Sequence, residues 1–291
     1  CTVLPRLIPA FLARFSSELA AAIETTDISA LSTTNVRALT TAAINALGTD
    51  QIAALTTAQT SVLTTAQTAA LNSAQVAALE STDLANLSSA QVAVFNTSQA
   101  AAIETGDIGA LSTNAVRALS SAAVGALSTD QIENLSSNQI GALTSAQTAA
   151  LNTAQAAAIQ TSDISAMGTA AVRALTTAAI AALGTDQIAA MSTAQTSALS
   201  SSQAQALTSN QVAALESTDL AAMNSAQIGA LNTSQAAAIE TTDISALNTT
   251  NVRALSTAAV NALTTDQIAA LTTAQTSVLT TAQAASLNTA Q

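Results

Sequence analysis

Residues 48–63, GTDQIAALTTAQTSVL, consist of two eight-residue phrases, 48–55 and 56–63, that are nearly identical. If position 8 is assigned to the large apolar residue, the same phrase repeats without an insertion from residue 16 to residue 287. Position 8 is then always Leu, Ile, Met or Phe, position 2 is always Ser or Thr, and position 4 is most often Gln. The chain is therefore a tandem array of octapeptides with the consensus TTAQIAAL, and its fold must be one that adds such units in sequence.

The spacing of the apolar residues inside one octad favours a helix. A strand would place positions 5 and 8 on opposite faces, whereas a helix places them on one face as i, i+3 neighbours. Alanine, which fills the positions between them, is the strongest helix former and a poor strand former. Successive position-8 residues would rotate by about 80° along a continuous helix, so no straight apolar seam could form. We therefore expect one short helix per octad, over roughly positions 3 to 8.

The residues between the apolar positions predict where these helices begin and end. Ser and Thr are preferred N-cap residues, which assigns Thr49, Thr57 and Thr185 at position 2 as N-caps. Glycine tolerates the left-handed turn that often follows a helix, which assigns Gly48 and Gly184 at position 1 as the residues that close the preceding helix.

Together, these features predict an all-α fold, a solenoid of short single helices with positions 5 and 8 facing inward. The phrase AAIET begins at Ala21 and at Ala101, and copies or close variants of it follow later in the chain. The spacings between them are all multiples of eight, so whole octads have been duplicated or lost. The block 76–99 equals three octads and hints at three octads per superhelical turn, although the sequence does not fix this number. A right-handed β-solenoid, with Leu stacked inside and Thr outside, is the alternative architecture.

Two domains are expected, a non-repetitive apolar segment over residues 1–15 and the octapeptide solenoid over residues 16–291. Cys1 can be interpreted as the lipidated first residue of a mature bacterial lipoprotein, or as the point at which a longer chain was cut. No run of about 20 uninterrupted apolar residues is present, so no transmembrane helix is predicted.

The composition argues against several classes of function. The formal net charge is −11, and Lys is absent, which disfavours a nucleic-acid partner because phosphate binding requires clustered basic residues. His and Tyr are also absent and the single Cys is terminal, so general acid–base or nucleophilic catalysis would have few groups to use. We expect no enzymatic activity, no cofactor and no metal site.

The most regular charged constellation combines an acid in one octad with an arginine in the next. We interpret it as structural ion pairs between neighbouring octads, with a repeated ligand or divalent-ion site as the alternative. The candidate pairs are Asp27 with Arg37, Asp107 with Arg117, Asp163 with Arg173, and Asp243 with Arg253.

Two uncharged polar positions also recur along the array. Gln at position 4 could align into a ladder of amide hydrogen bonds, which would satisfy buried polar groups, or could form an adhesive surface. The rows of Thr at positions 1 and 2 raise the hypothesis of ice binding, although helix capping accounts for the same residues.

The tandem phrasing AALTTAQTSVL at residues 269–279 resembles the Ala/Thr-rich repeat tracts of very large secreted bacterial surface proteins of adhesin or matrix type. This resemblance implies an extracellular or cell-surface location and a spacer or adhesive role. Our first hypothesis is a structural rod or filament segment that self-associates laterally or end to end. The second is a binding module that recognises a peptide or glycan on the solenoid surface.

Overall fold

The computed structural model describes residues 14–291 and contains 33 short α-helices and one 3-10 helix in that range, with no strand. The all-α solenoid is confirmed, and the β-solenoid alternative is wrong. The chain divides into two compact units, Cys1–Ala150 and Leu151–Gln291, and each is described by itself. The predicted non-repetitive segment 1–15, including Cys1, lies outside the described residues except for its last two positions.

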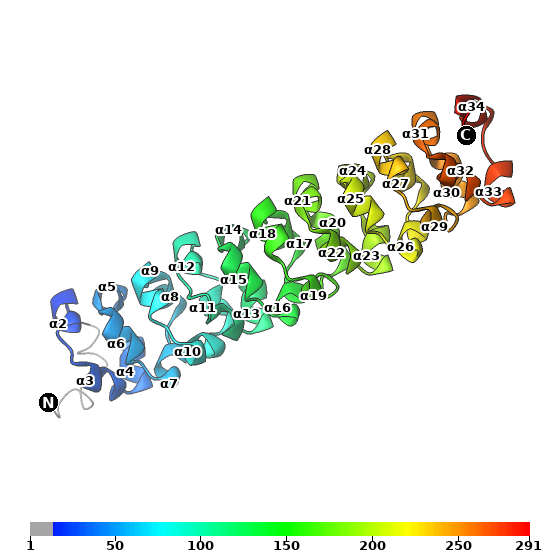
Figure 1. The fold of residues 1–291 in the computed structure, drawn as a ribbon. Helices are drawn as coiled ribbons and strands as arrows, with labels where there is room; N and C mark the ends of the chain where they lie inside the picture. The colour runs from blue at the N-terminus through cyan, green and yellow to red at the C-terminus, as the bar shows by residue number, and fades with distance from the viewer. Residues whose placement is uncertain (1–13) are drawn as a thin grey trace. The chain divides into compact units, whose positions relative to one another are not determined.

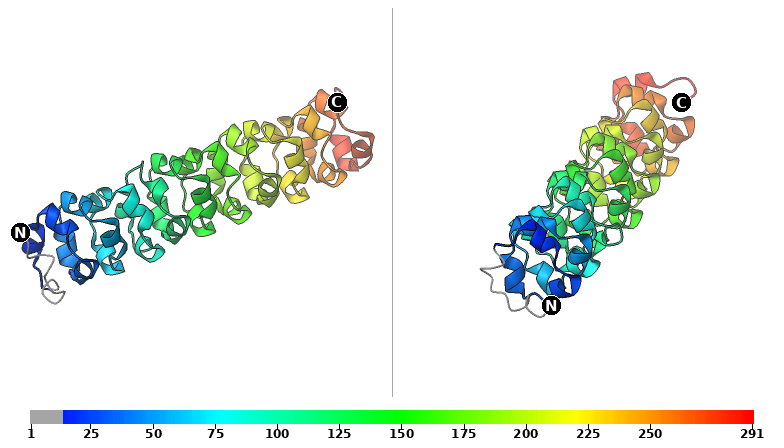
Figure 2. Two further views of the ribbon diagram at one scale, coloured as in Figure 1. Left: turned by 90° about the horizontal axis from the view of Figure 1, so that it is seen from below. Right: turned by 90° about the vertical axis from the view of Figure 1, so that its left-hand side faces the viewer.

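The helices of both units are built only from octads and are joined by very short links (Figures 1 and 2). In the first unit they are α2 (Ser17–Ala21), α3 (Thr25–Ser29), α4 (Thr33–Ala38), α5 (Thr41–Ala46), α6 (Thr49–Ala53), α7 (Thr57–Ser61), α8 (Thr65–Ala70), α9 (Ser73–Ala77), α10 (Ser81–Asn86), α11 (Ser89–Val92), α12 (Thr97–Ala101), η2 (Ile108–Ala110), α13 (Thr113–Ala118), α14 (Ser121–Gly125), α15 (Thr129–Glu133), α16 (Ser137–Ala142) and α17 (Ser145–Ala149).

In the second unit they are α18 (Thr153–Ala158), α19 (Thr161–Ile164), α20 (Thr169–Ala174), α21 (Thr177–Ala182), α22 (Thr185–Ala189), α23 (Thr193–Ala198), α24 (Ser201–Ala206), α25 (Ser209–Ala213), α26 (Ser217–Ala222), α27 (Ser225–Gly229), α28 (Thr233–Ala237), α29 (Thr241–Ile244), α30 (Thr249–Ala254), α31 (Thr257–Ala262), α32 (Thr265–Ala269), α33 (Thr273–Ser277) and α34 (Thr281–Ser286).

Each α-helix begins at position 2 of its octad, one residue earlier than predicted, and ends before position 8. Between α8 and α9, Leu71 has φ −60° and ψ 133°, and Asn72 has φ −82° and ψ 170°. These two extended residues redirect the chain. The octad thus consists of a helix of four to six residues, any remaining residues up to position 7, and a link made from positions 8 and 1.

The predicted caps are one position out of register. Thr49, Thr57 and Thr185 are the first residues of their helices, and the N-cap is the preceding residue at position 1. Gly48 and Gly184 are themselves N-caps with φ −73° and −69°, so they begin a helix instead of closing one. No residue in 14–291 has a positive φ. Because the link uses ordinary extended backbone, position 1 accepts Thr, Ser, Asn, Glu and Gly alike.

Helices three octads apart pack on one another within each unit. Contacts of this kind join α2 to α5, α5 to α8 and, in the second unit, α28 to α31. Three octads therefore complete one turn of the solenoid, as the block 76–99 hinted. Positions 5 and 8 form the core, with Ile52 fully buried and Leu55 5% exposed, whereas positions 2, 3 and 6 mostly face outward.

This packing predicts that a substitution at an inward position lowers the free energy of unfolding far more than one at an outward position. Ile140→Ala removes a fully buried side chain and should lower the free energy of unfolding by about 2–5 kcal/mol, because a cavity is left that the stack cannot collapse around. Ser121→Ala, at an exposed first helical residue, should change it by less than about 0.5 kcal/mol. Chemical denaturation of both full-length variants measures the difference, and equal midpoints would contradict the assigned core.

Candidate functional site: glutamine latches and acidic strips

The glutamine at position 4 is buried and uses both ends of its amide. In α7, the Gln59 Oε1 accepts the backbone N–H of Thr56 at 2.7 Å, while the Thr56 hydroxyl accepts the N–H of Gln59 at 3.3 Å. This reciprocal pair is a capping box, which satisfies donors that the helix start would otherwise leave unpaired. The glutamine therefore fixes the N-terminus of its own helix with its oxygen.

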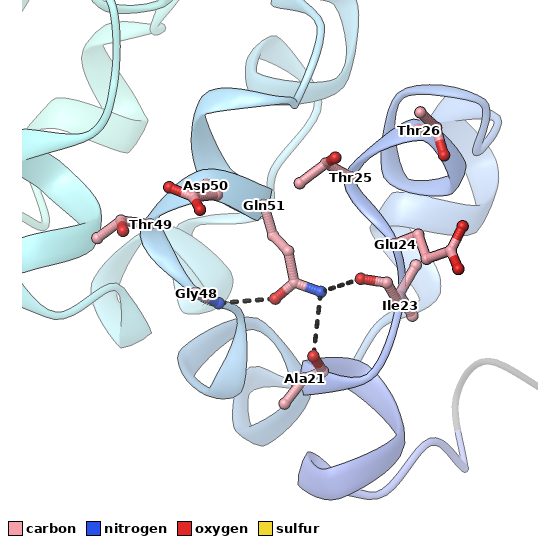
Figure 3. Close-up of a pocket in the computed structure, with 9 residues that line it drawn as sticks. All are labelled: Ala21, Ile23, Glu24, Thr25, Thr26, Gly48, Thr49, Asp50 and Gln51. Carbon is pink, nitrogen blue, oxygen red and sulfur yellow. Dashed lines mark hydrogen bonds between the residues drawn. The ribbon is translucent and has the colours of Figure 1, made fainter.

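The nitrogen of the same amide reaches a different part of the solenoid. The Gln59 Nε2 donates to the carbonyl oxygens of Ile28 at 2.8 Å and Leu31 at 2.7 Å, positions 5 and 8 of the octad four units earlier. Figure 3 shows the same arrangement at Gln51, whose amide joins Gly48 to the carbonyl of Ile23 at 2.6 Å. We call this contact, from the position-4 Nε2 to both carbonyls, a glutamine latch.

Glutamine latches recur through both units. They are formed by Gln51, Gln59, Gln67, Gln75, Gln91, Gln99, Gln131, Gln139 and Gln147 in the first unit and by Gln187, Gln195, Gln203, Gln211, Gln227, Gln235, Gln267, Gln275, Gln283 and Gln291 in the second. The buried role expected of these amides is present, but they bond to backbone carbonyls and not to one another.

The latch supplies a donor to the position-8 carbonyl, which the short helix cannot satisfy, and a second donor to the position-5 carbonyl, which already accepts the position-8 N–H, as Ile28 does from Leu31 at 3.1 Å. The position-8 carbonyl lies beyond the helix end, where no intrahelical N–H can reach it. A buried carbonyl without a partner costs about 1–3 kcal/mol, so each latch stabilises the stack mainly by preventing that loss. Across residues 14–291, no deeply buried side-chain nitrogen or oxygen lacks a hydrogen-bond partner.

Aspartate replaces the latch glutamine in six octads, and a carboxylate has no donor for the carbonyls. It accepts hydroxyl hydrogen bonds instead. Asp83 accepts one from the Thr60 hydroxyl at 3.0 Å, Asp107 accepts one from Ser81, and Asp243 accepts one from Ser217. Each of these bonds joins an octad to the one three octads earlier. Successive turns therefore stay hydrogen-bonded, but the later octad accepts the hydrogen bond, whereas in a latch it donates.

The acidic octads lie above one another in each unit. In the first, α10 packs on η2, and a Cβ on Gly109 of η2 would lie 3.1 Å from the carbonyl oxygen of Asn134, next to α15. In the second, α26 packs on α29 and α29 on α32. We call these two stacks the acidic strips. Their octads contain no basic residue, and their carboxylates are Glu80, Asp83, Glu104, Asp107, Asp130 and Glu133 in the first unit and Glu216, Asp219, Glu240, Asp243 and Asp266 in the second.

Shallow hollows lie between stacked acidic octads. One is bordered by Glu80, Ser81, Thr82 and Asp107, and the equivalent hollow in the second unit includes Glu216, Ser217, Glu240 and Asp243. A third, shown in Figure 3, lies between α3 and α6 and includes Glu24, Asp50 and Gln51. All three therefore combine carboxylates with the hydroxyls of helix starts.

The four predicted ion-pair sites have an acid near the core and an arginine at the surface. Asp163 and Asp243 are buried and Asp27 and Asp107 are half-buried, whereas Arg37, Arg117, Arg173 and Arg253 are exposed. Asp107 accepts a hydrogen bond from the Ser81 hydroxyl, and Asp243 accepts one from Ser217 and one from Thr242 at 3.2 Å. The ion pairs themselves stay a prediction. The stacking of acids into strips was missed, because it depends on three octads per turn.

The hollows offer carboxylate and hydroxyl oxygens, which can accept hydrogen bonds. Residues 14–291 contain no group of three or more Cys, His, Asp or Glu side chains placed to hold a metal ion. No helix in the same range has the length and apolar character needed to cross a bilayer. The pKa of the exposed Glu18 is lowered, first by a hydrogen bond from Ser16 and second by its own backbone N–H.

A family model described as an ALTTAQ repeat matches more than half of the chain, at residues 20–57, 76–102, 100–137, 156–193, 212–239 and 236–273. The chain therefore belongs to the ALTTAQ repeat family. A search of curated proteins finds no match.

The phrase of the family is present at residues 54–59, and five of its six letters have a distinct structural role there. Ala54 is the C-cap of α6, and Leu55 is the buried link residue. Thr56 caps α7, Thr57 begins it, and Gln59 forms the latch. The family phrase thus spans one link, one cap and one latch.

Two glutamines on α24 give a matched test of the latch. Gln203 forms a latch, whereas Gln205 is exposed on the same helix. Gln203→Glu places a carboxylate against two carbonyls and should lower the free energy of unfolding by about 2–4 kcal/mol at neutral pH. Gln205→Glu should change it by less than about 0.5 kcal/mol.

The effect of Gln203→Glu should depend on pH. Burial beside carbonyls disfavours the charged form, which raises the pKa of the introduced carboxyl above its unfolded value near 4.3. Stability is then greatest below that value and falls as the pH rises through the raised pKa. Thermal unfolding from about pH 3 to 7, referenced to Gln205→Glu at each pH, measures this. A pH-independent difference would contradict the latch geometry.

Proposed function

We propose that this chain is a structural, non-enzymatic repeat protein that forms a rod or filament segment of a bacterial cell-surface or extracellular fibre. The observation that supports it is the uniformity of the array: an N-cap at position 1, inward residues at positions 5 and 8 and, in most octads, a latch at position 4 recur in both units. A solenoid of this kind gains length by adding octads without altering those already present.

The outer surface also supports a structural role. Charged residues are 8% of the chain, and the outward positions 2, 3 and 6 are mostly Thr, Ser and Ala. A surface with few charges and short side chains loses little side-chain entropy and little hydration of ions when two copies pack laterally. Self-association of this kind fits the proposed fibre, and the resemblance to secreted surface-protein tracts fits an extracellular location.

Imaging tests the fibre proposal. Negative-stain electron microscopy of the purified chain, at several concentrations, should show elongated particles that associate side by side or end to end as concentration rises. Sedimentation at the same concentrations provides an independent measure of association. Particles that stay compact and monomeric at every concentration would contradict the proposal.

A second candidate function is adhesion or ligand binding through the solenoid surface, and the acidic strips are the observation that favours it. Localised departures from the consensus on one stack of octads are what a binding surface requires, and these departures recur in both units. Carboxylates beside hydroxyls suit a peptide that carries Lys or Arg side chains.

Charge-matched variants test this second function. A lysine-rich peptide should bind the wild-type chain, and Glu80→Gln with Glu104→Gln in the strip should weaken binding about threefold or more. Glu18→Gln with Asp186→Asn removes the same charge outside the strips and the hollows, and should leave the affinity nearly unchanged. Equal losses in both double variants, measured by calorimetry at physiological salt, would show only non-specific attraction to an acidic protein.

A further inference from the structure

One turn of the first unit has no latch residue at position 4. In the first unit, residues 104–127 form three consecutive octads whose position-4 residues are Asp107, Ala115 and Ala123. None of these carries an amide. The following turn, residues 128–151, instead carries the latches of Gln131, Gln139 and Gln147. Where both sides of an interface lie within residues 14–150, the interface between 104–127 and the octads of 72–103 below it is therefore the one that lacks all three latches.

The backbone carbonyls on the other side of this interface receive no latch hydrogen bonds. By the spacing of the other latches, Ala115 lies where a Gln would reach Leu84 and Leu87, and Ala123 where one would reach Val92 and Phe95. No side-chain amide donates to these carbonyls within the described residues. Residues 104–127 are joined to the octads of 72–103 by packing of α10 on η2, α11 on α13 and α12 on α14, and by the Ser81–Asp107 hydrogen bond.

The helix content of the same turn is also reduced. Within the described residues, octad 104–111 is the one octad whose helix is of 3-10 type, the three-residue η2. This octad contains two glycines, Gly106 before η2 and Gly109 within it. Glycine disfavours helix, and 3-10 hydrogen bonds have poorer geometry than α-helical ones. This observation does not depend on the latches, and it weakens the same turn.

We propose that residues 104–127 form a seam, a place at which the first unit opens locally more readily than at its fully latched turns. In an array held by nearest-neighbour interfaces, opening begins at the interface with the lowest stabilisation. The proposal rests on the hydrogen bonds of the fold and not on the proposed fibre function.

The second unit provides a graded comparison. Its corresponding turn, residues 240–263, has Asp243, Asn251 and Ala259 at position 4. Asn251 donates to the Met223 carbonyl at 2.8 Å, so one shorter latch remains. Residues 240–263 should therefore open less readily than residues 104–127, and more readily than the fully latched residues 184–207, where Gln187, Gln195 and Gln203 all bond.

Backbone hydrogen exchange on the full-length chain tests the seam. Amides in 104–127 should exchange about tenfold or more faster than those in 128–151, and 240–263 should lie between 104–127 and 184–207. Equal protection in 104–127 and 128–151 would overturn the proposal, and this measurement needs no variant.

Restoring the latches tests the cause. Ala115→Gln with Ala123→Gln supplies two of the three missing amides and should slow exchange in 104–127 about tenfold. Ala115→Met with Ala123→Met adds a side chain of similar length without a donor and serves as the matched control. Slowing by the Met variant equal to that by the Gln variant would show that bulk, and not the latch, limits opening.

Discussion

The structure depends on one hydrogen-bonding problem, which is that helices of four to six residues leave most of their backbone groups without intrahelical partners. The position-4 glutamine meets this need at two helices simultaneously. Its oxygen accepts the N–H at the start of its own helix, and its nitrogen donates to carbonyls at the end of a helix four octads earlier. A single side chain thus satisfies backbone groups at two helix ends and, because these ends lie in different turns, also holds the turns together.

This arrangement explains why an octad can be so short. Isolated helices below about 12 residues are marginal in water, because nucleation is costly and few hydrogen bonds repay it. In the solenoid, each helix is fixed by its N-cap and by the inward residues of positions 5 and 8, which pack on helices three octads away, and in most octads also by a latch. The octad is therefore stable only as part of a stack, and its free energy belongs to the interfaces between turns.

Departures from the consensus gather at particular octads. Where Asp replaces Gln, the carbonyls lose a donor, the carboxylate accepts a hydroxyl instead, and negative charge collects on one stack of each unit. Where Asp and Ala together replace Gln over a whole turn, as in residues 104–127, packing is retained but the latches are not. The long repeat in the sequence thus modulates both surface charge and the cohesion of successive turns.

The sequence by itself determined the octad period, the helix in each octad, and the inward direction of positions 5 and 8, because local spacing controls these features. It did not determine the cap, since Thr or Ser occurs at both positions 1 and 2, and only the backbone angles of the link show that position 1 is the N-cap, as at Thr56. It also did not reveal the partners of Gln59, or the alignment of Glu80 with Asp107. Those relations join residues in different turns, and the tertiary structure decides them because they follow from three octads completing each turn.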